Sequence, residues 1–73
     1  MKKELKQFQN ILKEYLKTDL ALQGMINEEE RLKRLQVYCR YIELINKILK
    51  NPENNNLTLE EIKTDYKIEM QAI

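Results

Sequence analysis

Residues 28–50 read EEERLKRLQVYCRYIELINKILK, and the apolar side chains of this stretch recur at the spacing of an α-helix. At about 100° per residue they fall on two adjacent stripes. One stripe holds Leu35, Tyr38, Ile42, Ile45 and Leu49, and the other holds Val37, Tyr41, Leu44 and Ile48. An apolar arc of roughly 100° is enough to pack one neighbour. Here the arc is about half of the circumference, so the sequence predicts a central helix with two packing partners.

The segment before this helix carries its own apolar stripe, which predicts a helix over residues 2–23. Its members are Leu5, Phe8, Leu12, Tyr15 and Leu22, with Ile11 and Leu16 beside them. Asp19 interrupts the stripe where an apolar residue is expected. Gly24, the one glycine of the chain, follows at the position of a C-terminal cap, because glycine takes the left-handed conformation without penalty.

Asn27 and the acidic triplet 28–30 indicate the start of the central helix, predicted over residues 28–50. Asn27 is a favourable N-cap, and acidic side chains are stabilised at the positive end of the helix dipole. A metal site is a poor explanation of the triplet, since three consecutive helical residues point in three directions.

A third helix is predicted over residues 59–72, after a short mobile connection at 51–57 that begins next to Pro52. Thr58 can cap this helix and Glu61 can complete a capping box. The apolar stripe of the helix consists of Leu59, Ile62, Tyr66, Met70 and Ile73.

Three amphipathic helices joined by brief connections predict an all-α fold, a small antiparallel three-helix bundle that forms a single domain over residues 1–73. In the simplest arrangement the first and third helices pack on the two stripes of the central helix. The alternative is a helical homodimer, in which a second copy covers one of these stripes. The sequence does not separate the two.

The residue types argue against catalysis. The 73 residues include no His and no Ser, which excludes Ser-His and Cys-His pairs and imidazole metal ligands. Glu60 and Glu61 are adjacent, but neighbouring helical side chains diverge by about 100° and cannot act on one bond. We therefore expect no enzyme activity, no cofactor, no metal and no small-molecule substrate.

Cys39 is the one cysteine, so no intrachain disulfide can form, and its apolar neighbours predict a buried structural thiol. A single cysteine is typical of a reducing compartment. Apolar runs such as Leu20 to Leu22 are far too short to span a membrane, and a cytoplasmic location is expected. The many Lys, Asn, Ile and Tyr residues, whose codons are AT-rich, suggest a bacterial, phage or other mobile-element genome of low GC content.

The preferred hypothesis is a non-enzymatic protein that binds another protein, or itself, as a regulator, inhibitor or adaptor. The candidate interface residues are Tyr38, Tyr41, Leu44, Ile48, Tyr66 and Met70. These side chains could equally form the core of the chain itself.

Nucleic-acid binding is the alternative hypothesis, because basic residues recur on one face of each of the first two helices. The candidate phosphate contacts are Lys6, Lys13, Lys17, Lys33, Arg40 and Lys47. Residues 1–51 carry eleven basic and seven acidic side chains, whereas residues 52–73 carry two and five. This asymmetry favours packing of the third helix on the first two.

Overall fold

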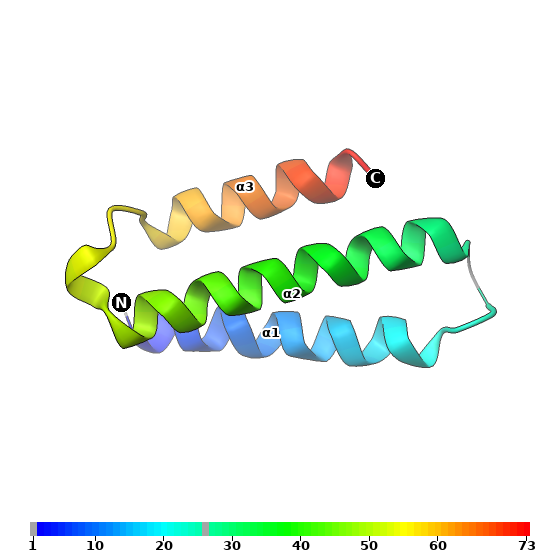
Figure 1. Cartoon of the computed structure of the whole chain (residues 1–73), viewed down its shortest axis with the longest axis horizontal. Coiled ribbons are helices and arrows are strands. Elements are labelled where there is room, and N and C mark those ends of the chain that lie inside the picture. Colours follow the sequence, from blue (N-terminus) through cyan, green and yellow to red (C-terminus); the bar gives the residue numbers. More distant parts are fainter. Residues whose placement is uncertain (1, 26) are drawn as a thin grey trace.

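The computed structural model describes residues 2–25 and 27–73, with the backbone only at Asn54. Three α-helices, α1 (Lys2–Ala21), α2 (Glu28–Lys50) and α3 (Leu59–Gln71), make up most of it, and a short 3-10 helix, η1 (Pro52–Asn54), precedes α3. Figure 1 shows α1 and α2 side by side and antiparallel, with α3 along the other side of α2. The predicted all-α three-helix bundle is confirmed.

The beginnings of α2 and α3 are capped as the sequence predicts. The side-chain oxygen of Asn27 accepts a hydrogen bond from the backbone N–H of Glu30, with 3.2 Å between the two atoms. The hydroxyl oxygen of Thr58 accepts one from the backbone N–H of Glu61 at 3.2 Å and donates to the Glu61 carboxylate at 3.2 Å. Each cap satisfies an amide that has no partner inside its helix.

Helix α1 ends at Ala21, two residues before the predicted end. The Asp19 carbonyl accepts from the backbone N–H of Leu22 at 3.2 Å, which replaces the α-helical pattern by a tighter turn. A second turn follows, in which the N–H of Met25 donates to the Leu22 carbonyl at 2.9 Å. Gly24 lies in this turn with φ of +81°, the left-handed conformation expected of it. Helix α3 likewise ends one residue early, at Gln71.

The core lies along α2, and both apolar stripes of this helix contribute to it. Its buried apolar members are Leu5, Phe8, Leu12, Val37, Tyr38, Tyr41, Ile45, Ile48 and Ile62. Leu35, Ile42, Leu44 and Leu49 of α2 are partly buried against them, as are Leu59, Tyr66, Met70 and Ile73 from the third helix and the chain end. Helix α2 therefore has α1 on one side and α3 on the other, as the broad apolar arc predicts.

The connection before α3 contains side-chain hydrogen bonds to its own backbone. The Asn55 side chain donates to the Leu57 carbonyl at 2.7 Å and accepts from the Leu57 N–H at 3.0 Å. Such side-chain bonds to the local backbone are typical of turns. The predicted mobility of residues 51–57 stays a prediction. Within the described part of the chain, no helix has the length and apolar character needed to cross a bilayer.

Candidate functional site

The six candidate interface residues lie in or against the intramolecular core. Tyr38, Tyr41 and Ile48 are buried, and Leu44, Tyr66 and Met70 are partly buried against the same cluster. Packing of α1 and α3 on α2 therefore uses the side chains that a partner protein was expected to contact. Tyr41 and Leu44 also line a surface hollow beside α3, and contact of these residues with a partner stays a prediction.

Tyr66 is the centre of an aromatic cluster that joins the three helices. Its ring centroid lies 5.8 Å from that of Phe8 on α1 and 5.7 Å from that of Tyr41 on α2, in edge-to-face geometry in both cases. The Tyr38 ring lies 6.4 Å away. These separations are in the range in which aromatic pairs attract beyond simple burial. The cluster fixes α3 against the α1–α2 hairpin.

Glu69 makes the polar contact between α3 and α2. Its carboxylate accepts hydrogen bonds from the Tyr41 hydroxyl and from the Arg40 guanidinium, which also pairs with it as an ion. Burial and the hydrogen bond to Glu69 raise the pKa of Tyr41 to about 12. The same hydrogen bonds from Tyr41 and Arg40 hold the pKa of Glu69 below its usual value. The acidic third helix thus forms an ion pair with a basic residue of α2.

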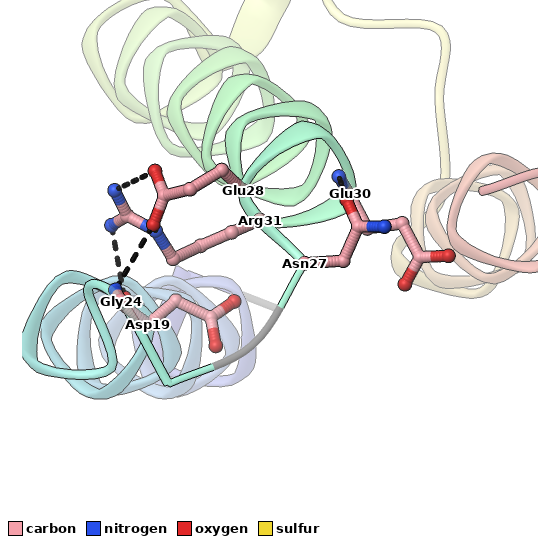
Figure 2. Close-up of polar contacts among 6 residues, drawn as sticks. All are labelled: Asp19, Gly24, Asn27, Glu28, Glu30 and Arg31. Carbon is pink, nitrogen blue, oxygen red and sulfur yellow. Dashed lines mark hydrogen bonds and ion pairs between the residues drawn. The ribbon is translucent and has the colours of Figure 1, made fainter.

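A second polar cluster lies at the connection between α1 and α2 (Figure 2). The Arg31 side chain is buried and donates to the Glu28 carboxylate at 3.1 and 2.9 Å and to the Asp19 carbonyl at 3.2 Å. The Glu28 carboxylate also accepts from the Gly24 N–H at 3.1 Å. Glu28 therefore belongs to this end of the hairpin, and the acidic triplet has a structural role beyond the helix dipole.

Asp19, which interrupts the apolar stripe of α1, is buried beside Arg34, whose Nε donates to its carboxylate at 2.9 Å. Burial by itself raises the pKa of the Asp19 carboxyl. Hydrogen bonds from Arg34 and Tyr38, with the positive charges of Arg34 and Arg31, outweigh burial and lower the pKa below its ordinary value. The folded state therefore prefers the ionised carboxylate more strongly than the unfolded chain does.

We expect this preference to make stability depend on pH. An acid whose pKa is lowered by folding stabilises the protein above the unfolded pKa, and this stabilisation is lost as the pH falls through the folded pKa. Replacing Asp19 with Asn keeps an acceptor but removes the charge, so Asp19→Asn should lower the free energy of unfolding at pH 7 by about 1 kcal/mol. The difference from the wild type should shrink as the pH falls below the pKa of an unfolded Asp, about 3.9. Urea unfolding followed by circular dichroism at several pH values measures both.

The control for this comparison is Glu43→Gln, which removes an exposed carboxylate that forms no ion pair among the described residues. Its unfolding curves should follow the wild type at each pH. A difference between the wild type and Asp19→Asn that stays constant as the carboxyl is titrated with acid would show that the Asp19 charge does not stabilise the fold.

The six candidate phosphate contacts do not form one strip. Lys33, Arg40 and Lys47 of α2 lie along the border with α3, where they line surface hollows with Asp65 and Glu69. Lys33 also pairs with Glu29 at 3.6 Å. In contrast, Lys6, Lys13 and Lys17 share the opposite side of α1, and Lys6 donates to the Gln9 side chain at 3.0 Å. The two basic rows therefore face different sides of the molecule.

Cys39 is exposed, so the prediction of a buried thiol is wrong. The reason is its position on α2, about 160° around the helix from Tyr41, which faces α3. It lies just outside the stripe that packs on α1, next to Leu35. The apolar residues near Cys39 in the sequence therefore do not bury its side chain in the fold.

We expect the Cys39 thiol to react with a reagent such as dithionitrobenzoate in the native protein. Because the side chain is exposed, the rate should stay within about threefold of the rate in denaturant. Absorbance of the released thiolate measures both rates. Reaction that begins only when the chain unfolds would place Cys39 in the core.

Cys39 belongs to an apolar area on the side of the hairpin that α3 does not cover. We define the open flank as Leu20, Leu32, Leu35 and Cys39. Leu20 is 54% and Leu32 is 52% exposed, and Cys39 is exposed as well. Leu32, Leu35 and Cys39 line a surface hollow together with Gln36, Arg40 and Glu43.

The hydrogen bond from Arg31 to the Asp19 carbonyl brings the end of α1 to the start of α2, and so sets Leu20 at the level of Leu32. Around their helices, Leu20 lies about 120° from Phe8 and Leu32 about 180° from Tyr41, the residues that meet α3. In Figure 2, the neighbouring Glu28 and Arg31 lie on the left, away from α3 at the right. Both helices therefore present apolar side chains on the same uncovered side.

The other exposed large apolar residues are more scattered. Met25 lies in the turn after α1, and Ile68 lies on the outer face of α3. The ring of Tyr15 packs 6.1 Å from that of Tyr38. Among residues 2–25 and 27–73, no cluster of three His, Cys, Asp or Glu side chains has the arrangement of a metal site. A comparison with known protein families, curated proteins and solved structures finds no match to this chain.

Proposed function

We propose that this protein acts by binding another protein through the open flank, as a regulator, inhibitor or adaptor and without catalysis. The observation that supports this proposal is that Leu20 is 54% and Leu32 is 52% exposed. The helical spacing of each residue places it away from α3. Scattered exposed apolar residues are common on monomeric proteins, whereas a contiguous apolar area next to a hollow is typical of an interaction site.

The use of the core residues inside the chain also favours the open flank as the binding surface. The buried apolar residues already hold α1 and α3 on α2, so they are not free to bind a partner. The open flank can bind one without any change in the fold. Complexes of this kind usually form with little backbone movement.

A cytoplasmic location is part of the proposal. The exposed Cys39 thiol has no second cysteine in the chain to pair with. An accessible single thiol persists in a reducing compartment and is prone to intermolecular disulfides in an oxidising one.

Cys39 also provides the experiment, because the flank can be labelled at this one thiol. We would attach a benzophenone maleimide to Cys39 and irradiate the labelled protein in an extract of the organism that encodes it. A discrete covalent adduct with one protein is expected. Its yield should fall about tenfold when Leu20 and Leu32 are both replaced with Glu, because the charges oppose burial of the flank.

The matched control carries the label on the outer face of α3, at Ile68→Cys in a Cys39→Ser background. Ile68 is 59% exposed and lies away from the flank, so it should give no adduct with the same protein. Equal labelling from both positions, or an adduct that survives the double substitution, would refute binding through the flank.

A further inference from the structure

We infer that α3 is a displaceable cover, which opens from the α1–α2 hairpin as one unit while the hairpin itself stays folded. The inference comes from the unequal way in which the two outer helices are held on α2. It concerns the α3 side of the hairpin, so it is independent of the open flank and of the proposed function.

Helix α1 is fixed on α2 by buried contacts that extend from Leu5 to Asp19. Gln9 is fully buried and donates to the Ile42 carbonyl at 3.0 Å, and Asp19 is buried against Arg34 at 2.9 Å. Separation of α1 from α2 breaks these hydrogen bonds and exposes polar groups that have lost their partners, which is strongly unfavourable. It also breaks the apolar core, to which α1 contributes Leu5, Phe8 and Leu12.

Helix α3 is held by fewer buried groups. Ile62 is the one buried residue among the described residues of α3. Glu69 accepts a hydrogen bond from Tyr41 and pairs with Arg40, whose side chain is 61% exposed. An exposed ion pair adds little stability, because solvent and salt screen it. The other apolar contacts of α3 come from partly buried side chains, which are Leu59, Tyr66 and Met70.

The length of α3 makes its opening a single event. The helix has 13 residues, against 20 in α1 and 23 in α2. An isolated helix shorter than about 12–15 residues is marginal in water, so α3 depends on its packing against the hairpin. Once Ile62 leaves its buried site, the rest of α3 loses its support as well. The hairpin keeps the buried contacts between α1 and α2 and stays folded, which is a sub-global opening.

The opening uncovers an aromatic and aliphatic face of the hairpin. In the closed chain, the Tyr66 ring lies 5.8 Å from the Phe8 ring and 5.7 Å from the Tyr41 ring, measured between centroids. Val37 and Ile48 belong to the same cluster, and α3 lies along this side of α2 (Figure 1). The closed chain hides this face and the opened chain presents it to solvent, so α3 controls its exposure.

Hydrogen exchange of single amides in the full chain, followed by NMR at several low urea concentrations, tests the inference. The amides of Tyr66 and Met70 should share one protection factor, at least about tenfold below that of Ile45 in the core of α2. Urea should lower the protection of α3 less steeply, because the opening exposes less surface than global unfolding does.

Three results of this measurement would overturn the inference. An equal protection factor and urea dependence for α3 and Ile45 would mean that the chain opens by global unfolding alone. Protection that decreases gradually from Tyr66 to Met70 would mean fraying of α3 and not opening as a unit. Protection of α3 that rises with protein concentration would mean that the helix is exchanged between two copies of the chain.

Two matched variants separate opening of α3 from global unfolding. Leu12 is 0% and Ile62 is 1% exposed, and Leu12→Val and Ile62→Val each remove one buried methylene group. Ile62→Val should lower the protection of both Tyr66 and Ile45 about fivefold, because the Ile62 contacts are lost in both events. Leu12→Val should lower the protection of Ile45 about fivefold but that of Tyr66 by less than about twofold, because Leu12 stays packed on α2 when α3 opens.

Circular dichroism checks that both variants keep the fold. An equal loss of protection at Tyr66 and Ile45 in Leu12→Val would show that α3 is released only when the hairpin unfolds. Unchanged protection of Tyr66 in Ile62→Val would show that Ile62 does not hold α3 in place. Either result would contradict the inference and leave the proposal for the open flank unaffected.

Discussion

Replacing Leu12 with alanine is expected to lower the free energy of unfolding by about 3 kcal/mol. The Leu12 side chain is completely buried between α1 and α2, and its truncation removes apolar contacts and leaves a cavity. A chain of 73 residues is expected to have a total stability of about 4–11 kcal/mol. The substitution therefore removes a large share of the stability, which urea unfolding followed by circular dichroism measures.

The neighbouring residue provides the control. Ile11 is 46% exposed, so Ile11→Ala should lower the free energy of unfolding by less than about 1 kcal/mol. Both substitutions remove the same number of side-chain atoms, because Leu and Ile are isomers. Similar losses for the two variants would show that α1 does not bury the face assigned to it. A larger loss for Ile11→Ala would mean that α1 is rotated relative to α2.

Ending the chain after Asn51 is expected to have an effect at least as large. Removal of α3 exposes the buried surface that Ile62 and Tyr66 cover on Phe8, Val37 and Tyr41. Burial of a single large apolar side chain contributes about 1.5–3 kcal/mol. We therefore expect a loss of about 3 kcal/mol or more, together with a smaller dependence of the free energy on urea, because less surface is buried.

Two substitutions in the full chain test the same contact without removing the helix. Ile62 is 1% exposed and Ile68 is 59% exposed, so Ile62→Ala should destabilise the protein and Ile68→Ala should have little effect. A chain ending at Asn51 that is as stable as the full chain would mean that α3 is a free arm. Equal effects at Ile62 and Ile68 would contradict the face on which α3 packs.

The helices and their partners could be predicted from sequence because the signals were local and repeated. Asn27 and Thr58 mark the first turns of α2 and α3, and both form the expected caps. The two apolar stripes of α2 predict two neighbours, and α1 and α3 occupy them. Helical period and capping chemistry depend on residues a few positions apart, which a single sequence displays directly.

The polar contacts inside the fold were not predicted, because each joins residues far apart in the sequence. Gln9 is fully buried and donates to the Ile42 carbonyl at 3.0 Å and to the Asn46 side chain at 2.6 Å. Asp19 pairs with Arg34 across the hairpin. Gln9 and Asp19 are both polar residues on an apolar stripe. This was the one feature of the sequence that could have indicated a buried polar contact. Such a residue needs a buried partner, which only the antiparallel register identifies.

The sequence does not separate candidate interface residues from core residues, for a related reason. Apolar and aromatic side chains at helical spacing are found both in cores and in interfaces, so Tyr38 or Ile48 fits either. The position of α3 decides between them, because its Ile62, Tyr66 and Met70 pack in the cluster that contains Tyr38 and Ile48. The uncovered side, with Leu32 and the exposed Cys39, becomes visible once the position of α3 is known.

The central claim is that α3 packs on one side of α2 while the opposite flank of the hairpin stays uncovered. Nuclear Overhauser effects in the full chain measure this most directly. The account predicts contacts of the Tyr66 ring protons with those of Phe8 and Tyr41, and none between the Leu32 methyl groups and α3. Contacts of the Leu32 methyl groups with Tyr66 or Met70 would place α3 on the flank and contradict it.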